Sequence, residues 1–412
     1  MIRSICLGVN EGEVINFANS RSFQSFVPLI EETSKDLEIN VRTIRMTLSP
    51  TSIAGDRLLK LNNFASKIDE ISKSVGIRWF CIPVDLFDAS LSEMDFNIIT
   101  QVLDRFDNLF VNLLVTKCGE IDLNAAASAA NIIRDTGRGG EGGGNCFRLG
   151  ASANVAPHTP FFPFSYHSGE PCFSIAVETN QIAVQVMEEL AVGEGADVFK
   201  KRFSSEFKNV ISRVENLANR LEKKTGLYFA GIDASFAPFP DGRNSVSKVV
   251  QEIGGSPVGT PGSVAVTAFL TSLIQDLMNK EGIRSVGFNG VMYSVMEDNL
   301  LADQSISGGL NIEQLMLLSS VCGCGIDMVP ISGITSSDTI LSFIMDTASM
   351  AIRLDKPLGV RLLPIPGKLA GEITDINGDF ICNSRIFHTS QQPSTGLLGR
   401  NEKVKLTGGF HG

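Results

Sequence analysis

The chain has 412 residues, 43% of them hydrophobic and 19% charged, with 39 glycines, which is typical of an α/β protein with a sizeable core. Its formal net charge of -10 disfavours binding to phosphate backbones and anionic membrane surfaces. No basic stripe interleaved with aromatic residues runs along the chain, so we expect neither nucleic acid nor a membrane as a partner.

The N-terminal residues lead directly into a strand-like segment without the apolar run of a secretory signal. No apolar stretch approaches the roughly 18 residues of a membrane span. The 8 cysteines lie mostly in apolar segments, where a reduced thiol behaves as a small hydrophobe. We therefore expect a cytoplasmic protein.

Short β-branched runs alternate along the chain with segments of helical periodicity. Helices are predicted over residues 21–37, 55–75 and 91–106, and a further one ends near Arg134. Strands are predicted over residues 2–9, 41–48, 78–85, 109–116, 146–155, 172–179, 228–235, 285–291, 325–331 and 359–365. Because these strands are apolar throughout, both faces of a mostly parallel sheet should be covered.

The hydrophobic pattern fits a closed α/β barrel and a doubly wound open sheet almost equally well. Near the C-terminus, the Asn377-Gly378 pair lies between two strand-like pieces and predicts an antiparallel hairpin. We therefore divide the chain into an α/β body over residues 1–370 and an appended hairpin and tail over residues 371–412.

Several segments together resemble a known family, the one described as domain of unknown function 711 or uncharacterised protein family 0210. The matching segments are IRSICLGV, ANVAPHTPFFPFSYH, FAGIDASFAP, SVCGCGIDMVPISGITSSDTI and VRLLPIPGK, in this order. The resemblance implies a single ten-stranded, mostly parallel α/β barrel similar to that of pyruvate formate-lyase. It implies no reaction, and the C-terminal GLLGRNEKVKLTGGFHG lacks the Arg-x-x-Gly-Tyr type motif of glycyl radical enzymes, so we do not expect radical chemistry.

In parallel α/β proteins the residues that follow the strands collect at one end of the sheet. We therefore expect one binding site for a small anionic metabolite, built from side chains at these positions. The candidate substrate-binding residues are Arg45, Asn154, Glu178, Asn289, Ser332, Thr335, Ser336 and Lys368. Ser332, Thr335 and Ser336 belong to SGITSSDT, which would offer helix N-terminal amides to an anion; the same residues are also ordinary helix caps. For Lys368 the alternative is a plain surface lysine.

Two of the 4 histidines, His158 and His167, lie nine residues apart in a proline-rich loop. An imidazole suits proton transfer at neutral pH, and we favour His167 as the general acid or base. Asp233 and Asp327 would orient it or hold a cation, and the aromatic FFPF would pack the loop against the barrel rim. The alternative for His167 is a structural histidine bonded to a neighbouring carbonyl.

A divalent metal is a further hypothesis, with His158 and His167 joined by Glu178 or Asp233 as ligands, although their spacing matches no metal motif. Cys322 in the CGC segment is a candidate nucleophile, with a buried small hydrophobe as the alternative. The glycine-rich run over residues 137–144 is either a lid that carries Arg138 or Arg148 or a flexible connector.

These patterns predict an enzyme that acts on a small anionic metabolite by acid–base chemistry, as a lyase, isomerase or hydrolase. A non-catalytic metabolite-binding or regulatory protein is the alternative. The apolar composition and the family resemblance favour a homodimer.

Overall fold

A computed structural model describes residues 1–52, 57–89, 91–139, 141–390 and 403–408. Its strands are β1 (Ile2–Val9), β2 (Val41–Leu48), β3 (Thr51–Ser52), β4 (Trp79–Asp85), β5 (Leu109–Leu114), β6 (Thr116–Lys117), β7 (Glu120–Asp122), β8 (Leu149–Ala153), β9 (Cys172–Val177), β10 (Tyr228–Asp233), β11 (Gly325–Ser332), β12 (Leu358–Ile365) and β13 (Lys403–Lys405). Its helices are α1 (Val14–Phe17), α2 (Arg21–Asp36), α3 (Arg57–Val75), α4 (Glu93–Arg105), α5 (Leu123–Arg138), α6 (Asn180–Glu188), α7 (Ala196–Thr225), α8 (Val246–Gly254), α9 (Ser263–Lys280), α10 (Asn299–Ile306), α11 (Ile312–Ser319) and α12 (Ser337–Arg353), with 3₁₀ turns η1 (Glu141–Arg148) and η2 (Val295–Glu297).

The main sheet has the strand order β10-β9-β1-β2-β4-β5-β8-β12-β11, with the short β3 paired to β4. Strands β1, β2, β4, β5 and β8 run parallel to one another. Strands β9 and β10 form a parallel pair, as do β11 and β12. Both pairs run antiparallel to the first group, because β9 joins β1 and β12 joins β8 in antiparallel register.

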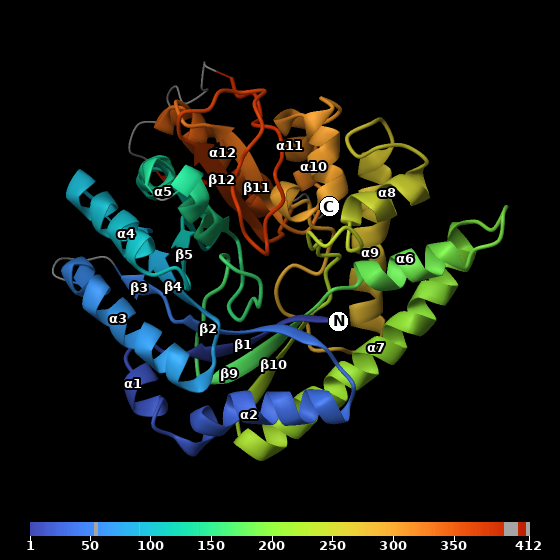
Figure 1. Ribbon diagram of the computed structural model, residues 1–412, viewed down its shortest axis with the longest axis horizontal. Helices are drawn as coiled ribbons and strands as arrows, with labels where there is room; N and C mark the ends of the chain where they lie inside the picture. The colour runs from blue at the N-terminus through green and yellow to red at the C-terminus, as the bar shows by residue number, and fades with distance from the viewer. Residues whose placement is uncertain (53–56, 90, 140, 391–402, 409–412) are drawn as a thin grey trace.

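Figure 1 shows the helices on the outside, around the strands. Every residue of β1, β9, β11 and β12 is buried, which explains their continuous apolar character. Helix α2 is amphipathic and buries Phe23, Phe26 and Ile30, which recur at helical spacing on the face towards the core. Within the described ranges, no helix combines the length and apolar character needed to cross a membrane.

The antiparallel pairing of β9 with β1 and of β12 with β8 contradicts the expectation that all the strands end at the same edge of the sheet. The carboxyl ends of β1, β2, β4, β5 and β8 lie at one end of the sheet, and those of β9 to β12 lie at the other. Residues that follow strands of the two groups therefore cannot all meet at one rim.

Nine of the ten predicted strands are present, but residues 285–291 do not form a regular strand. The left-handed backbone at Gly287 (φ 75°) and Asn289 (φ 47°) interrupts the extended conformation. Single bridges instead connect this stretch to its neighbours, at Ile232–Ser285, Phe236–Val291 and Ser294–Asp327. The segment thus lies between β10 and β11, and a closed ten-stranded barrel stays a prediction.

Residues 154–171, here called the aromatic loop, cross the inner face of the sheet. Ser4 of β1 donates to the carbonyl of Pro160 (2.8 Å), and Asn112 of β5 donates to that of Ser165 (3.3 Å). Phe164 packs closely on Gly150 of β8 and Gly359 of β12. The aromatic segment therefore enters the interior rather than packing at the rim.

The C-terminal segment packs against the main body. Ile373 and Arg385 form an antiparallel bridge on either side of Asn377-Gly378, and Phe387 bridges to Ile331 of β11. The tail beyond it contributes β13, which pairs with β7 in a second, three-stranded sheet. The division of the chain at residue 370 stays a prediction.

The described part of the glycine-rich run, residues 137–139 and 141–144, continues α5 and forms η1. Gly137 and Gly143 pack so closely on Pro364 that a Cβ at either position would lie 2.7 Å from it. Arg148 donates to the backbone carbonyls of Leu103 and Leu109, at 2.8 and 3.1 Å. These contacts tie the run to the sheet, which argues against a lid.

Replacing Gly359 by alanine should destabilise the protein by about 1–3 kcal/mol, because the added methyl group meets Phe164 and the core has no room for it. In the present packing the new Cβ would lie 2.4 Å from the Phe164 ring. Urea unfolding measures this, with Gly12→Ala as the control because nothing lies within 4 Å of that position. Equal stability of the two variants would show that the aromatic loop does not pack on β12 as described.

Asp233 at the end of β10 connects this strand to the 285–291 segment. Its carboxylate accepts from the amides of Phe288 (2.7 Å) and Asn289 (3.2 Å) and from the Ser235 hydroxyl (2.6 Å). Burial raises its pKa to about 6, although these hydrogen bonds oppose the rise. Because this pKa lies above that of the unfolded chain, the folded state takes up the proton first as the pH falls.

The contribution of Asp233 to the free energy of unfolding should therefore increase as the pH falls from about 7 to about 4, by up to about 1.4 kcal/mol per pH unit. Urea unfolding of wild type and Asp233→Asn at several pH values gives the free energy of unfolding of each protein as a function of pH. The difference between the two proteins is the contribution of Asp233. A difference that is independent of pH, or that grows as the pH rises, contradicts the assignment.

Candidate functional site

The inner face of the sheet borders a small cavity of about 30 Å³. Charged, polar and aromatic side chains from strands, loops and the C-terminal segment meet there. It is lined by Arg3, Arg45, Trp79, Phe110, Phe147, Phe161, Phe162, Phe164, Ala237, Pro238, Phe288, Met292, Ser294, Glu297, Cys324, Asp327, Arg361 and Phe380. Of the predicted site residues, Arg45 and Asp327 line this cavity.

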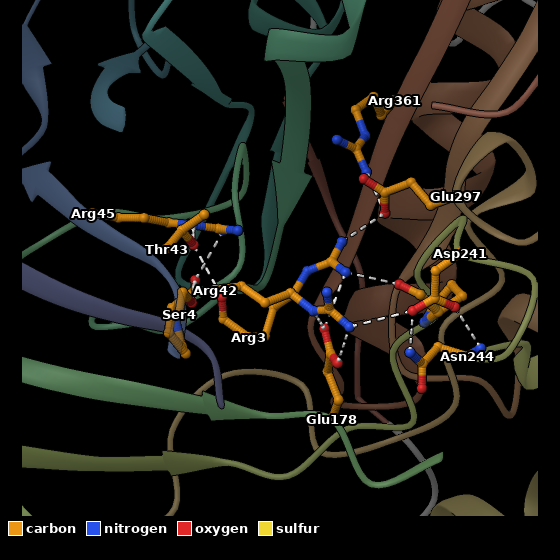
Figure 2. A network of polar contacts seen from close by, with 12 residues as sticks. Arg3, Ser4, Arg42, Thr43, Arg45, Glu178, Asp241, Asn244, Glu297 and Arg361 are labelled. Atoms are coloured by element: carbon orange, nitrogen blue, oxygen red, sulfur yellow. Dashed lines mark hydrogen bonds and ion pairs between the residues drawn. The ribbon is translucent and has the colours of Figure 1, made fainter. Parts of the chain in front are cut away.

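A chain of alternating charges runs beside the cavity (Figure 2). Arg361 of β12 pairs with Asp327 through two bonds of 2.6 and 2.9 Å and approaches Glu297 at 3.6 Å. Glu297 in turn lies 3.5 Å from Arg3 of β1. Arg3 also pairs with Glu178 at 3.2 Å. Each of these charges therefore has an opposite charge close by.

The chain continues to the protein surface through Arg42 of β2. Arg42 forms two bonds with Glu178, at 2.9 and 3.2 Å, and lies 3.6 Å from Asp241. Its guanidinium also stacks over the Phe239 ring at 3.8 Å. Glu178 is therefore held by two arginines and serves to neutralise them.

Arg45 is the exception in this network. It is only 3% exposed, and among the described residues no carboxylate lies within 4 Å of it. Its guanidinium donates to the Thr43 hydroxyl (2.9 Å) and the Pro160 carbonyl (3.4 Å) and lies over the rings of Trp79 and Phe162. Burial, and after it the repulsion from Arg3, lower its pKa to about 9. Figure 2 shows Arg45 to one side of the ion-pair chain.

Asp327 is the cavity carboxyl whose proton affinity is altered most clearly. Burial raises its pKa, and the paired Arg361 opposes this rise. Asp327 lies in the third position of β11, opposite Ser294, to which it is bridged. A buried carboxyl beside a cavity is suited to holding or transferring a proton.

The CGC segment lies at the start of β11. Cys324 lines the cavity, whereas Cys322 is buried behind it and does not. A hydrogen bond from the Cys324 thiol, and after it the nearby Lys356, lower the pKa of Cys322. The same interaction and burial raise the pKa of Cys324. The thiol that faces the cavity is therefore protonated, and the nucleophilic role predicted for Cys322 stays a hypothesis.

One wall of the cavity is aromatic. Trp79 contacts Phe110, Phe147 and Phe380 with ring centroids 5.1, 6.2 and 4.7 Å apart. Phe380 belongs to the C-terminal segment, so that segment helps to enclose the site. Such rings exclude water and strengthen the charge interactions beside them.

The other predicted residues lie away from the cavity, at both ends of the sheet. The Asp233 carboxylate accepts from the Asn289 amide at 3.2 Å, and the Asn289 side chain accepts from the Ala234 amide at 2.9 Å. Asn154 is at the end of β8 and donates towards the carbonyls of Ala351 and Lys356 (3.4 Å each). These contacts fix loops, and their proposed role in substrate binding gains no geometric support.

Ser332, Thr335, Ser336 and Lys368 gather where β11 and β12 end. Ser332 donates to the Lys368 carbonyl at 2.8 Å, and Ser336 caps α12 by accepting from the Thr339 amide at 3.2 Å. The Lys368 ammonium donates to the Ile373 carbonyl at 2.6 Å and pairs with Asp375 at 3.3 Å. The cap and these contacts account for Ser332, Ser336 and Lys368, whereas the buried Thr335 hydroxyl has no hydrogen-bond partner among the described residues.

His158 and His167 lie at the end of the sheet opposite Asp233. The His167 amide donates to Leu48 at the end of β2 (2.8 Å), and its ring packs on Gly8 at the end of β1. Burial lowers its pKa to about 4. The two histidines are therefore apart from Asp233 and Glu178, which lie at the carboxyl ends of β10 and β9. His167 also does not line the cavity that Asp327 lines. The grouping of His167 with Asp233, and a metal site that joins the two histidines to Glu178 or Asp233, are therefore wrong.

Among the cavity residues that were not predicted are Arg3, Trp79, Glu297 and Arg361. Arg3 and Arg361 interrupt otherwise apolar strands, and this was the available signal, since a charge in a buried strand needs a partner or a ligand. Glu297 belongs to η2, a segment that sequence periodicity does not reveal.

Comparison with known proteins places the chain in a family. Residues 2–377 match the model of a family described as uncharacterised ACR (DUF711). A UPF0210 protein of Pyrobaculum aerophilum is 29% identical over 85% of this chain and 79% of its own length. A UPF0210 protein of Methanopyrus kandleri is 28% identical over 85% and 80%, and one of Acetivibrio thermocellus 26% over 93% and 87%. On this match over nearly its whole length, the chain belongs to the uncharacterised DUF711 family.

Proposed function

We propose that the protein binds a small anionic metabolite in the central cavity and catalyses proton transfer on it. The observation that carries this proposal is Arg45, a buried guanidinium that faces the cavity without a carboxylate partner. The cavity is lined by three arginines and two carboxylates, so its local charge favours an anion.

The cavity chemistry also describes the ligand. A planar guanidinium such as that of Arg45 binds a carboxylate or a phosphate through two parallel hydrogen bonds. The aromatic wall formed by Trp79, Phe110 and Phe162 suits an apolar or planar portion of the ligand. The ligand class is therefore a very small carboxylate or phosphate, in keeping with the small volume of the cavity.

Asp327 is the group proposed to transfer the proton, in place of His167. Because the pKa of Asp327 is raised, this carboxyl is protonated to a greater extent than an exposed one at the same pH. Its pairing with Arg361 fixes its orientation. Such a group can remove and return a proton on the carbon next to the carboxylate of a bound metabolite. This reaction type includes lyases and isomerases.

Replacing Arg45 by methionine should abolish anion binding and at the same time raise the free energy of unfolding by about 1–2 kcal/mol, because a buried unpaired charge is removed. Thermal unfolding in inorganic phosphate, acetate and succinate measures the first effect, and urea unfolding the second. Arg78→Met is the matched control, since Arg78 is exposed and contacts Trp79 from outside the cavity lining. A destabilised Arg45→Met protein, or a wild type that responds to none of these anions, contradicts the proposal.

Replacing Asp327 by asparagine should lower proton-transfer activity by about 100-fold or more while the anion still binds. Proton NMR in deuterated water detects exchange next to the carboxylate in a panel of small acids, even without net turnover. Asp346→Asn is the control, because burial also raises the pKa of Asp346 but this residue does not line the cavity. Binding without any exchange by the wild-type protein would favour a non-catalytic metabolite-binding protein instead.

A further inference from the structure

The aromatic loop brings His158 and His167 together although nine residues separate them. The His158 amide donates to the Tyr166 carbonyl at 2.8 Å and closes the loop at its base. The two imidazole rings consequently lie with their centroids 5.2 Å apart. This closure places two imidazole side chains at the base of the loop, away from the aromatic residues in the cavity.

A cysteine completes the group. Cys172 is the first residue of β9, and its sulfur lies 3.3 Å from Nδ1 of His158 and 3.6 Å from Nδ1 of His167. Ligand atoms of the three residues all lie within 4.8 Å of one another. A tetrahedral zinc ion with ordinary bond lengths separates a nitrogen and a sulfur ligand by about 3.6 Å. The two observed nitrogen–sulfur separations are close to this value.

The surroundings of His167 orient it as a ligand. Its Nε2 lies 2.9 Å from the Gly169 carbonyl, so this nitrogen carries the proton and donates it. The Nδ1 lone pair then points towards the Cys172 sulfur. A metal-binding histidine is commonly held by such a bond to a backbone carbonyl. Gly8 leaves the space that the ring needs, since a Cβ there would lie 2.4 Å from Nδ1.

We propose that His158, His167 and Cys172 bind one zinc ion, with water as the fourth ligand. His167 and Cys172 are buried whereas His158 is half-buried, which leaves the side of His158 open to solvent. On binding, two Zn–N bonds and one Zn–S bond form, and the thiol proton is released to solvent. The site is separate from the anion cavity and does not depend on the proposed function.

The alternative is a group held by hydrogen bonds alone. In that case the Cys172 thiol donates to one imidazole and the other imidazole donates to the sulfur. These hydrogen bonds would persist without a metal, and the three residues would bind no metal ion. Metal affinity and a thiolate–metal absorption band therefore distinguish the two arrangements.

The test uses the full chain, freed of metal with a chelator and then titrated with Zn²⁺ or with Co²⁺ as a spectroscopic substitute. The expected result is one metal ion per chain by mass spectrometry, a sulfur-to-cobalt charge-transfer band and release of a thiol proton. His158→Asn and Cys172→Ser should each lower the affinity by at least about 100-fold, since each removes a direct ligand. His388→Asn and Cys118→Ser should bind like the wild type, because neither residue belongs to the group.

Circular dichroism of each variant establishes that it is folded before affinities are compared. The wild-type titration decides the matter on its own if a variant fails to fold. A wild-type protein that binds no zinc in competition with a weak chelator overturns the proposal, as does cobalt binding without the charge-transfer band. Unchanged affinity in Cys172→Ser overturns it as well.

Discussion

The burial of charge inside the sheet is the constraint on which the rest of this structure depends. Four carboxylates and four arginines lie in or beside one network, and seven of these eight groups approach an opposite charge within 3.6 Å. Removing such groups from water costs several kcal/mol each unless partners compensate. The exception, Arg45, has a hydroxyl, a carbonyl and two aromatic faces as neighbours. The proposal of an anionic ligand rests on this guanidinium, which lies beside the cavity without a carboxylate partner.

Strand positions could be predicted because a strand covered on both faces is apolar at every residue, and nine such segments were found within a few residues of their predicted bounds. Strand direction could not be predicted, because an apolar run looks the same in parallel and antiparallel pairs. The joins of β9 to β1 and of β12 to β8 therefore invalidated the idea of a common rim. The missing strand, 285–291, contains a glycine and an asparagine in left-handed conformations, which outweigh its β-branched residues.

The same limit explains why most residues of the candidate site could not be predicted. Arg45 and Asp327 both line the cavity, but they were selected only by their positions along strands, and strand position cannot tell which side chains face inward. Arg3 and Arg361 would have been found by a different criterion, namely a charge inside an otherwise buried strand. Cys172 could not have been joined to the two histidines from the sequence. Their meeting depends on the turn over residues 168–171 and on the antiparallel register that sets Cys172 beside Gly8.

The aromatic loop links the two sites physically. Phe161, Phe162 and Phe164 line the cavity, while His158 and His167 at the base of the same loop face Cys172. The loop is closed at its base by a backbone hydrogen bond and is tied to β1, β4 and β5 through Ser4, Cys81 and Asn112. Close-packed interiors transmit small displacements, because side chains have no empty space in which to absorb them. A metal ion that draws the two imidazoles towards the sulfur would therefore also fix the position of the aromatic wall, and with it the shape of the space in front of Arg45.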